Sequence, residues 1–176
     1  QVGGQLAAMG VERLVLLNAH GGQIGLLQVA ARQLRLRCPS MGVLPCFIWS
    51  GVDGLSSLLP PEELAHGLHA GQAETSLMLH MAPELVGPSR PMDGAHGPRS
   101  ALAPPDGWSL EGAAPCAWLT SDLSQSGVIG DARLASAELG LELEQALILH
   151  WTQRFKSLLS SDWPPTESVV DWPRKS

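Results

Sequence analysis

A strand–helix–strand pattern near the start of the sequence constrains the fold more than any other feature. Residues 14–18 (LVLLN) form a short, continuous apolar run, followed by glycines and a helical pattern over residues 22–37. Such a run predicts a buried strand of a parallel sheet, and apolar residues at steps of three and four give the helix one apolar face. Residues 42–49 (GVLPCFIW) are a second candidate strand, in which Pro45 indicates an edge or a bulge. Because a crossover helix joins parallel strands, the sequence predicts an α/β fold with a mostly parallel sheet.

The rest of the chain is organised around further helices and one long irregular stretch. We expect one domain over residues 1–159. Pro60 and Pro61 begin a third element. The remaining predicted elements are the end of a helix over residues 1–10, a helix over 73–81, a Pro- and Gly-rich excursion over 87–115, a final helix over 134–159 and an extended tail over 160–176.

Composition excludes some classes of function. Apolar residues make up 44% of the 176 residues and charged residues 16%, a balance typical of a globular domain. The net charge of -6 argues against nucleic acid as a partner, and no apolar run reaches the roughly 18 residues of a membrane span. The three cysteines form no CxxC pair and are odd in number, which favours a reducing compartment, so we expect the cytoplasm.

A polar cluster, Asn18-Ala19-His20-Gly21-Gly22-Gln23, lies where the first strand passes into its helix. Ligands of open α/β sheets bind outside the carboxyl ends of strands, so His20 is a candidate functional residue. Gly21 and Gly22 allow a sharp turn and expose amides at a helix N-terminus, which suits an anion. The alternative is a histidine that merely caps the turn.

The second cluster is the segment HAGQAETS, residues 69–76. His69 and Glu74 are five residues apart, so they would not share a face of one regular helix, but Gly71 permits a turn between them. Glu74 then falls in the first helical turn, where a purely capping acid is the alternative explanation. A strand-end histidine together with a His and a Glu supplies the donors that Zn²⁺ or Mn²⁺ takes. His66 is a weaker candidate, because a histidine beside Gly67 is expected at the surface, and His80, in the middle of an apolar helix, is expected to be a core or interface histidine.

Several other chemistries lack their motifs. The sequence contains no G-x-S-x-G elbow, no G-x-G-x-x-G after Asn18, no Walker lysine and no H-E-x-x-H. An anion or nucleotide binder that uses only the glycine turn at residues 21–22 therefore remains a weaker alternative.

Three stretches together resemble the creatininase (creatinine amidohydrolase) family. NAHGGQ (18–23) is similar to its N-G-H-G-G-N motif, HAGQAETS (69–76) to H-A-G-E-x-E-T-S, and SGVIGDARLASAELG (126–140) to G-V-x-G-D-P-x-x-A-x-x-x-G. The resemblance implies a three-layer α/β/α domain, a homo-oligomer (usually a hexamer) and a two-metal site holding Zn²⁺ or Mn²⁺. It implies hydrolysis of a C–N bond in a small cyclic or linear amide or formamide by metal-activated water.

The same resemblance implies roles for individual residues. His20 and Glu74 would bind metal, and His69 would be the catalytic residue that handles the proton for the leaving nitrogen. Asn18, Gly21 and Gly22 would line the substrate side of the site.

The sequence also departs from the family pattern. Ala19, Gln23 and Ala132 are mild changes, whereas Gln72 stands where the family has an acid. The family's first motif, G-S-x-E-Q-H-G-x-H followed by an Asp, has no counterpart, and the first residue is Gln1. We therefore expect an N-terminally truncated member that is inactive as this chain. The alternative is a non-catalytic relative that acts as an oligomer subunit or as an anion-binding α/β domain.

Overall fold

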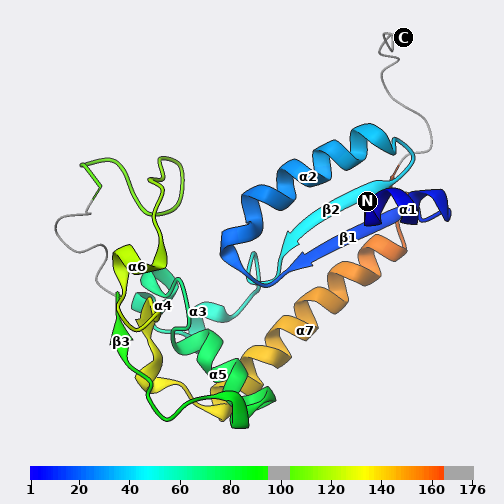
Figure 1. Cartoon of the computed structure of the whole chain (residues 1–176). Coiled ribbons are helices and arrows are strands. Elements are labelled where there is room, and N and C mark those ends of the chain that lie inside the picture. The colour runs from blue at the N-terminus through cyan, green and yellow to red at the C-terminus, as the bar shows by residue number, and fades with distance from the viewer. Residues whose placement is uncertain (95–103, 165–176) are drawn as a thin grey trace. The chain divides into compact units, whose positions relative to one another are not determined.

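The computed structural model describes residues 1–94 and 104–164. They form two compact units, Gln1–Gly51 together with the chain from His150 onward, and Val52–Leu149. Figure 1 labels most of the elements. In chain order they are α1 (Val2–Ala8), β1 (Arg13–Asn18), η1 (Gly21–Gln23), α2 (Ile24–Arg37), β2 (Gly42–Phe47), α3 (Leu55–Leu58), α4 (Pro61–His66), α5 (Gln72–Met81), η2 (Pro83–Leu85), β3 (Met92–Asp93), α6 (Thr120–Leu123), β4 (Gly130–Asp131), η3 (Ala132–Leu134) and α7 (Ala137–Leu159).

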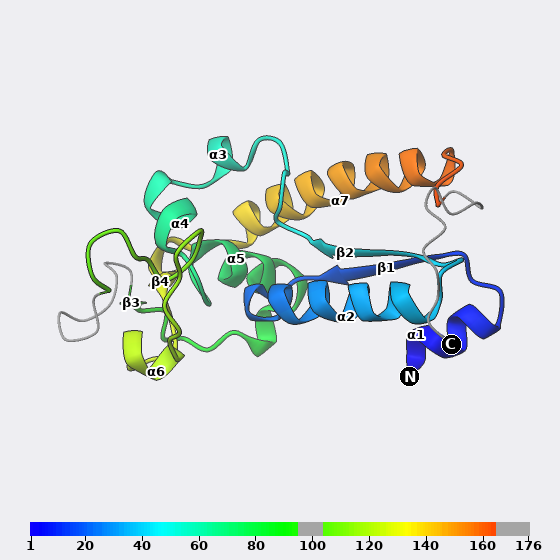
Figure 2. The ribbon, with the colours of Figure 1, turned by 90° about the horizontal axis from the view of Figure 1, so that it is seen from above.

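The first unit is built on the predicted strand–helix–strand motif. Strands β1 and β2 pair in parallel, with Arg13 opposite Gly42 and Asn18 opposite Phe47. Helix α2 connects them and covers one face of the sheet, and the part of α7 from His150 onward covers the other face (Figures 1 and 2). The predicted α/β class and its three-layer arrangement are therefore confirmed.

Pro45 lies on the outer edge of β2, as its place in the sequence indicated. The amide of Gly42 donates to the carbonyl of Glu12, and that of Ile48 donates to the carbonyl of Asn18. Alternate residues of β2, counted from Gly42, thus direct their N–H groups toward β1. Pro45 falls between them, so its nitrogen faces away from β1 and its missing N–H removes no bond from the ladder.

Side chains attach the end of α7 to the sheet. The guanidinium of Arg13 donates to the carbonyls of Leu158, at 2.9 Å, and Ser161, at 2.6 Å. Leu158 lies in the last turn of α7 and Ser161 follows that helix, where positive charge is favoured. The indole of Trp151 donates to the carbonyl of Ile48 at 2.9 Å. Sheet and helix are thus joined at both ends of the contact.

A mainly apolar cavity of about 810 Å³ lies within this unit, and Asn18 is among its lining residues. Because all of residues 44–47 of β2 line it together with residues of both covering helices, it runs along the outer edge of β2. Its apolar and aromatic lining includes Ile24, Leu27, Phe47, Trp151, Phe155 and Trp163.

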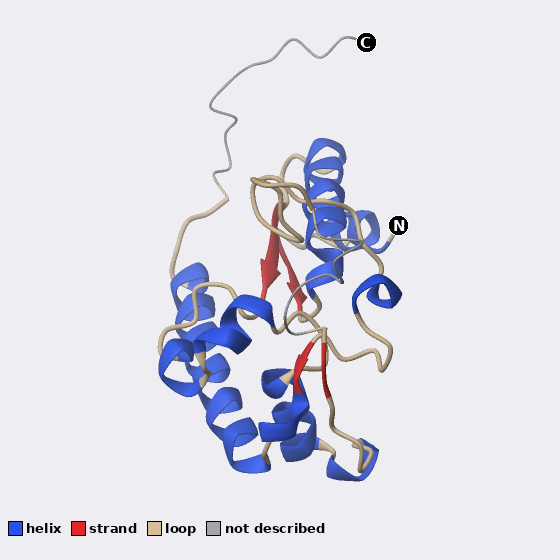
Figure 3. Cartoon of the chain, turned by 90° about the vertical axis from the view of Figure 1, so that its left-hand side faces the viewer, coloured by secondary structure: helices blue, strands red, loops and turns tan. Residues whose placement is uncertain are grey.

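The second unit is organised around α5, α7 and a two-stranded antiparallel sheet of β3 and β4, drawn in red in Figure 3. Helices α5 and α7 touch at Gly140, where an added Cβ would collide with the carbonyl oxygen of Ser76. Ser76 is fully buried at this contact. His80 on α5 and Glu144 on α7 form an ion pair of 3.2 Å nearby. The close contact between α5 and α7 therefore depends on two small residues, Ser76 and Gly140, and the His80–Glu144 ion pair lies beside it.

The element predictions agree with the structure in most places. The helices predicted over residues 73–81 and 134–159 are α5 and α7, although α7 begins at Ala137, after η3. Part of the predicted excursion over 87–115, and most of the tail over 160–176, fall outside the described residues, so the domain boundary stays a prediction. Among the described residues, no helix combines the length and apolar character that crossing a membrane requires.

Candidate functional site

The turn that carries His20 is held by the side chain of Asn18. The Asn18 amide nitrogen donates to the carbonyl of His20 at 2.7 Å, and its oxygen accepts from the amide of His20 at 3.2 Å. Asn18 is buried, whereas His20 is exposed at the start of η1. Asparagine is suited to this because its side chain can mimic the backbone of a turn. The structure therefore presents His20 at the carboxyl end of β1, where the sequence predicted it.

The three residues predicted to face substrate lie around His20, but in different ways. The two polar groups of the Asn18 side chain bond to the His20 backbone, so this residue positions the histidine. A Cβ added to Gly22 would lie 3.1 Å from Cε1 of His20, which shows that the ring leans over this glycine. No described atom lies within contact distance of a Cβ at Gly21. Their contact with a substrate stays a prediction.

In the second unit, the backbone of His69 pairs with the buried Ile129. The amide of Ile129 donates to the carbonyl of His69 at 2.7 Å, and the amide of His69 donates back at 3.1 Å. Ile129 is 1% exposed, so this pair fixes the His69 backbone against the core. The His69 side chain is 42% exposed, and its ring is accessible from solvent.

Glu74 faces the ring of His69 from the first turn of α5. Its Oε2 lies 3.9 Å from Nδ1 of His69 and accepts a hydrogen bond from the amide of Ala70 at 2.6 Å. The hydroxyl of Thr75 donates to the carbonyl of Ala70 at 3.0 Å, which ties the same turn to the helix. Glu74 is thus an acid in the first turn of α5, as predicted, and its carboxylate holds the turn before that helix and lies beside His69.

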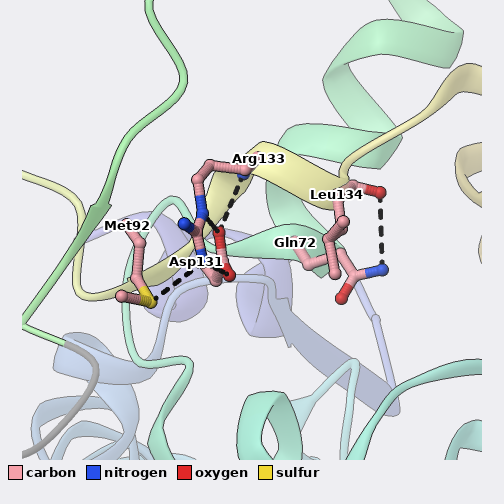
Figure 4. Close-up of polar contacts among 5 residues, drawn as sticks. All are labelled: Gln72, Met92, Asp131, Arg133 and Leu134. Carbon is pink, nitrogen blue, oxygen red and sulfur yellow. Dashed lines mark hydrogen bonds and ion pairs between the residues drawn. The ribbon is translucent and has the colours of Figure 1, made fainter.

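The second and third sequence motifs meet at Gln72 and Leu134 (Figure 4). The amide nitrogen of Gln72 donates to the carbonyl of Leu134 at 3.5 Å, at the limit of a hydrogen bond. Beside them, Arg133 donates to both carboxylate oxygens of Asp131, at 2.8 and 2.7 Å. The Arg133 guanidinium lowers the pKa of Asp131, and Asp131 raises the pKa of Arg133. This ion pair fixes the turn that follows β4.

Asp93 holds the loop that leads to Ile129, and sequence reasoning missed it. Its Oδ2 accepts from both the amide and the hydroxyl of Ser126 at 2.9 Å, from the hydroxyl of Ser124 at 2.8 Å and from the amide of Gln125 at 2.9 Å. These donors hold the pKa of Asp93 well below its usual range, the Ser126 amide having the largest effect. Asp93 thereby orders the segment that pairs with His69.

A second missed residue is Glu63, which is 8% exposed. Its Oε1 accepts from the amide of Ala73 in the first turn of α5, at 2.9 Å. In the sequence it resembles any acid in the first turn of a helix. The glycines on either side of His69, Gly67 and Gly71, are the only local signal of an unusually tight turn.

A cavity of about 330 Å³ lies beside Glu74 within the second unit. Arg90 also lines it, and its guanidinium donates to the carbonyl of Ala135 at 3.2 Å. The other lining residues include Ala70, Thr75, Met78, Leu85 and Val128. The Glu74 side chain therefore lines a cavity that is large enough for a small chemical group.

The predicted metal donors are of the right type but do not form a complete site by themselves. Imidazole nitrogen and carboxylate oxygen suit Zn²⁺ and Mn²⁺. Across residues 1–94 and 104–164, however, no group of three or more His, Cys, Asp or Glu side chains is arranged to hold an ion. The structure brings His69 and Glu74 together, while His20 belongs to the other compact unit. Protein sites for Zn²⁺ use about three or four ligands, so further donors are required.

Comparison with known proteins gives a consistent result. The family model described as "Creatininase: Creatinine amidohydrolase" matches residues 1–155. The chain is 34% identical over 137 residues to the mycofactocin precursor peptide peptidase of Mycobacterium ulcerans (strain Agy99), covering 78% of this chain and 45% of that protein. It is 31% identical over 145 residues to the protein of that name from Mycobacterium tuberculosis (strain CDC 1551 / Oshkosh), covering 82% and 48%. The chain thus spans about half the length of the curated relatives it matches.

Solved structures show the same fold. One described as "Creatininase Mn" superposes with a TM-score of 0.64 at 26% identity, covering 91% of this chain and 62% of that chain. A creatininase mutant described as "Zn-Zn type" superposes with a TM-score of 0.60 at 22% identity, covering 91% and 61%.

Proposed function

Because this chain belongs to the creatininase family, we propose that the protein is a metal-dependent amidohydrolase that breaks a C–N bond of an amide. The observation that carries the proposal is the pair formed by His69 and Glu74, whose Nδ1 and Oε2 atoms lie 3.9 Å apart on an ordered turn. A half-exposed imidazole beside a carboxylate is the usual arrangement for moving a proton to or from a substrate.

In this proposal His69 donates the proton that the leaving nitrogen needs. A carboxylate beside Nδ1 favours a proton on that nitrogen, so in this proposal Nε2 first accepts a proton from the attacking water and then passes it to the leaving nitrogen. The 3.9 Å separation is longer than a hydrogen bond, but such contacts are often long in the absence of substrate. Asn18 supports the site indirectly, because its side chain fixes the backbone of His20.

We propose His20 and Glu74 as the metal donors that this chain contributes, with further donors from outside the described residues. Relatives of this fold described as "Zn-Zn type" and "Creatininase Mn" support Zn²⁺ or Mn²⁺ as the metal. Since the described residues hold no complete set of donors, no step of the reaction is routed through the ion.

The proposed substrate is a small cyclic or linear amide. The relatives named mycofactocin precursor peptide peptidase extend this class to a peptide bond, which is itself a linear amide. By the same family resemblance we propose a homo-oligomer, hexameric in form, and from the odd number of cysteines without a CxxC pair we propose that it works in the cytoplasm.

Two substitutions in the full-length protein test the roles of the histidines. His20→Ala should reduce both bound metal and amide hydrolysis, whereas His69→Ala should retain metal and lose turnover by a factor of about 100 or more. Metal content is measured by elemental analysis and hydrolysis by release of the amine. His66→Ala, a change of an exposed histidine in the same region, is the control and should alter neither. Full metal content and turnover in His20→Ala would contradict its role as a ligand.

The second candidate is a non-catalytic relative, which the incomplete donor set favours. The coding sequence upstream of Gln1 separates the two candidates. An in-frame segment with a Glu-x-His pattern followed by an Asp is expected if the protein is an enzyme. A stop codon or an unrelated sequence there would favour the non-catalytic relative.

A further inference from the structure

A buried carboxylate lies beneath the turn that carries His69. Glu63 on α4 is 8% exposed, and its Oε1 accepts a hydrogen bond from the amide of Ala73 at 2.9 Å. Its other oxygen, Oε2, is buried without a hydrogen-bond donor among the described residues. Burying a carboxylate oxygen without a hydrogen-bond donor costs free energy of folding, so the presence of Glu63 at this position requires an explanation.

Three glycines enclose this carboxylate. A Cβ added to Gly67 would lie 2.6 Å from Oε2 of Glu63, and one added to Gly71 would lie 2.6 Å from Oε1. At Gly130 an added Cβ would lie 3.3 Å from Oε2 and 3.0 Å from the Cα of Gly71. The end of α4 and the start of α5 thus approach the carboxylate too closely for a Cβ to fit without a shift, and strand β4 approaches it at a distance that a Cβ would make tight.

Two of these glycines delimit the segment that carries His69. The amide of Gly67 donates to the backbone carbonyl of Glu63 at 2.8 Å, and Gly71 is the N-cap of α5. Between them, Ala70 has a φ of 49°, the only positive φ of a non-glycine residue in the described part of the chain. Such a conformation persists where the surroundings impose it. The carboxylate of Glu63 therefore lies against both ends of the segment that carries His69.

We propose that Glu63 is a positioning residue for His69: its buried carboxylate fixes the turn over residues 67–71 and, through it, the ring of His69 opposite Glu74. The catalytic part of this inference rests on the proposed function. In this proposal the Glu63 carboxylate fixes the turn in two ways. Its oxygen accepts from an amide in the first turn of α5, where negative charge is favoured, and its volume fills the space between the three glycines.

Three substitutions in the full-length protein separate these features. Glu63→Gln keeps the volume and an acceptor for the Ala73 amide. Glu63→Leu keeps much of the volume and removes the acceptor. Glu63→Asp keeps the charge but shortens the side chain, and it provides a milder variant in case Glu63→Leu does not fold.

Glu63→Leu should lower kcat by about 10- to 100-fold with little change in KM, because His69 is displaced while the rest of the site is kept. Glu63→Asp should give a smaller loss in the same direction, and Glu63→Gln should recover most of the activity. Exchange of the Ala70 and Ala73 amides with deuterium should accelerate in the Leu and Asp variants, while that of Leu143, in the core of α7, stays unchanged.

The ring of His69 gives a readout that a purely structural role would not move. Its NMR signal at one fixed pH should shift in the Leu and Asp variants, while the signal of His80, paired with Glu144 in the same unit, stays in place. If both signals move, or Leu143 exchanges faster as well, Glu63 only stabilises the unit and the proposal is wrong. Unchanged kcat, exchange and His69 signal in Glu63→Asp and Glu63→Leu would equally overturn it.

These readouts also separate this proposal from the proposed function. If the protein hydrolyses no amide, the exchange and NMR measurements still test whether Glu63 fixes the turn. If hydrolysis requires His69 but is insensitive to Glu63, only the positioning role fails.

Discussion

Asp93 illustrates how one side chain can order a loop that reaches the candidate site. Four donors converge on its Oδ2, and they favour the ionised form in the folded protein. The pKa of the carboxyl is therefore lowered relative to its unfolded value of about 3.9. A lowered pKa contributes stability that is present above about pH 4 and is lost as the pH falls toward the folded pKa.

Asp93→Asn should lower the unfolding midpoint at pH 7, because the amide cannot accept from all these donors. The difference in unfolding midpoint between Asp93→Asn and wild type should become smaller below about pH 4. In that range the stabilisation that ionised Asp93 gives the wild-type protein begins to be lost. Thermal unfolding at both pH values checks this. Asp106→Asn is a suitable control, since Asp106 is exposed and its change should have little effect at either pH. A constant difference between Asp93→Asn and wild type at pH 7 and pH 3 would contradict the electrostatic explanation.

The sequence predicted the residues of the candidate site that its motifs contain and missed those that support them. His20, His69 and Glu74 stood out because their motifs have a recognisable order. Glu63 did not, because its partners are amides and glycines that only the tertiary fold brings to it. Asp93 lies in β3, within the stretch that the sequence predicted to be irregular, and a two-residue strand carries no local pattern that indicates its long-range contacts.

Helices α5 and α7 are held close by a glycine that the third sequence motif contains. A Cβ at Gly140 would meet the carbonyl oxygen of Ser76 and come within 2.7 Å of the Cβ of His80. The last position of the motif SGVIGDARLASAELG is therefore explained by close packing of two helices.

Gly140→Ala should destabilise the protein by about 1–3 kcal/mol, because α7 must move away from α5. Gly25→Ala is the matched control on α2, where an added Cβ would lie within 4 Å of no described atom apart from its chain neighbours and the nearby backbone of the same helix. It should gain about 0.5–1 kcal/mol, since alanine favours a helix more than glycine does. Urea unfolding of both variants measures the difference. Equal effects at the two positions would show that helix propensity, and not packing, decides the result.

At the scale of elements, periodicity was informative where helices and strands are long. It located β1, α2, β2, α5 and α7 within a few residues. It did not reveal β3 and β4, because two-residue strands are too short to carry an alternating pattern. It also gave the final helix too early a start, because η3 occupies Ala132–Leu134.

At the scale of the whole molecule, the described residues hold an incomplete set of metal donors. The chain matches about half the length of its curated relatives, and the described residues bring only His69 and Glu74 together. Two donors do not make a tight site, since Zn²⁺ sites use about three or four protein ligands.

The 176-residue chain alone should therefore lose Zn²⁺ readily to a competing chelator, whereas a protein in which further donors complete the site should retain it. Competition against a fluorescent zinc indicator measures both. The comparison also requires that the chain alone is folded, which circular dichroism checks. Tight, equimolar binding by the chain alone would show that its own residues complete the site.

Pro45 makes the two edges of the small parallel sheet chemically unequal. The outer edge of β2 lacks a donor at its centre, so a foreign strand finds no continuous ladder there. Residues 13, 15 and 17 of β1 turn their amides and carbonyls outward without such an interruption. A further strand would therefore pair more readily beside β1 than beside β2, and so would an aggregating neighbour if the β1 edge were left uncovered.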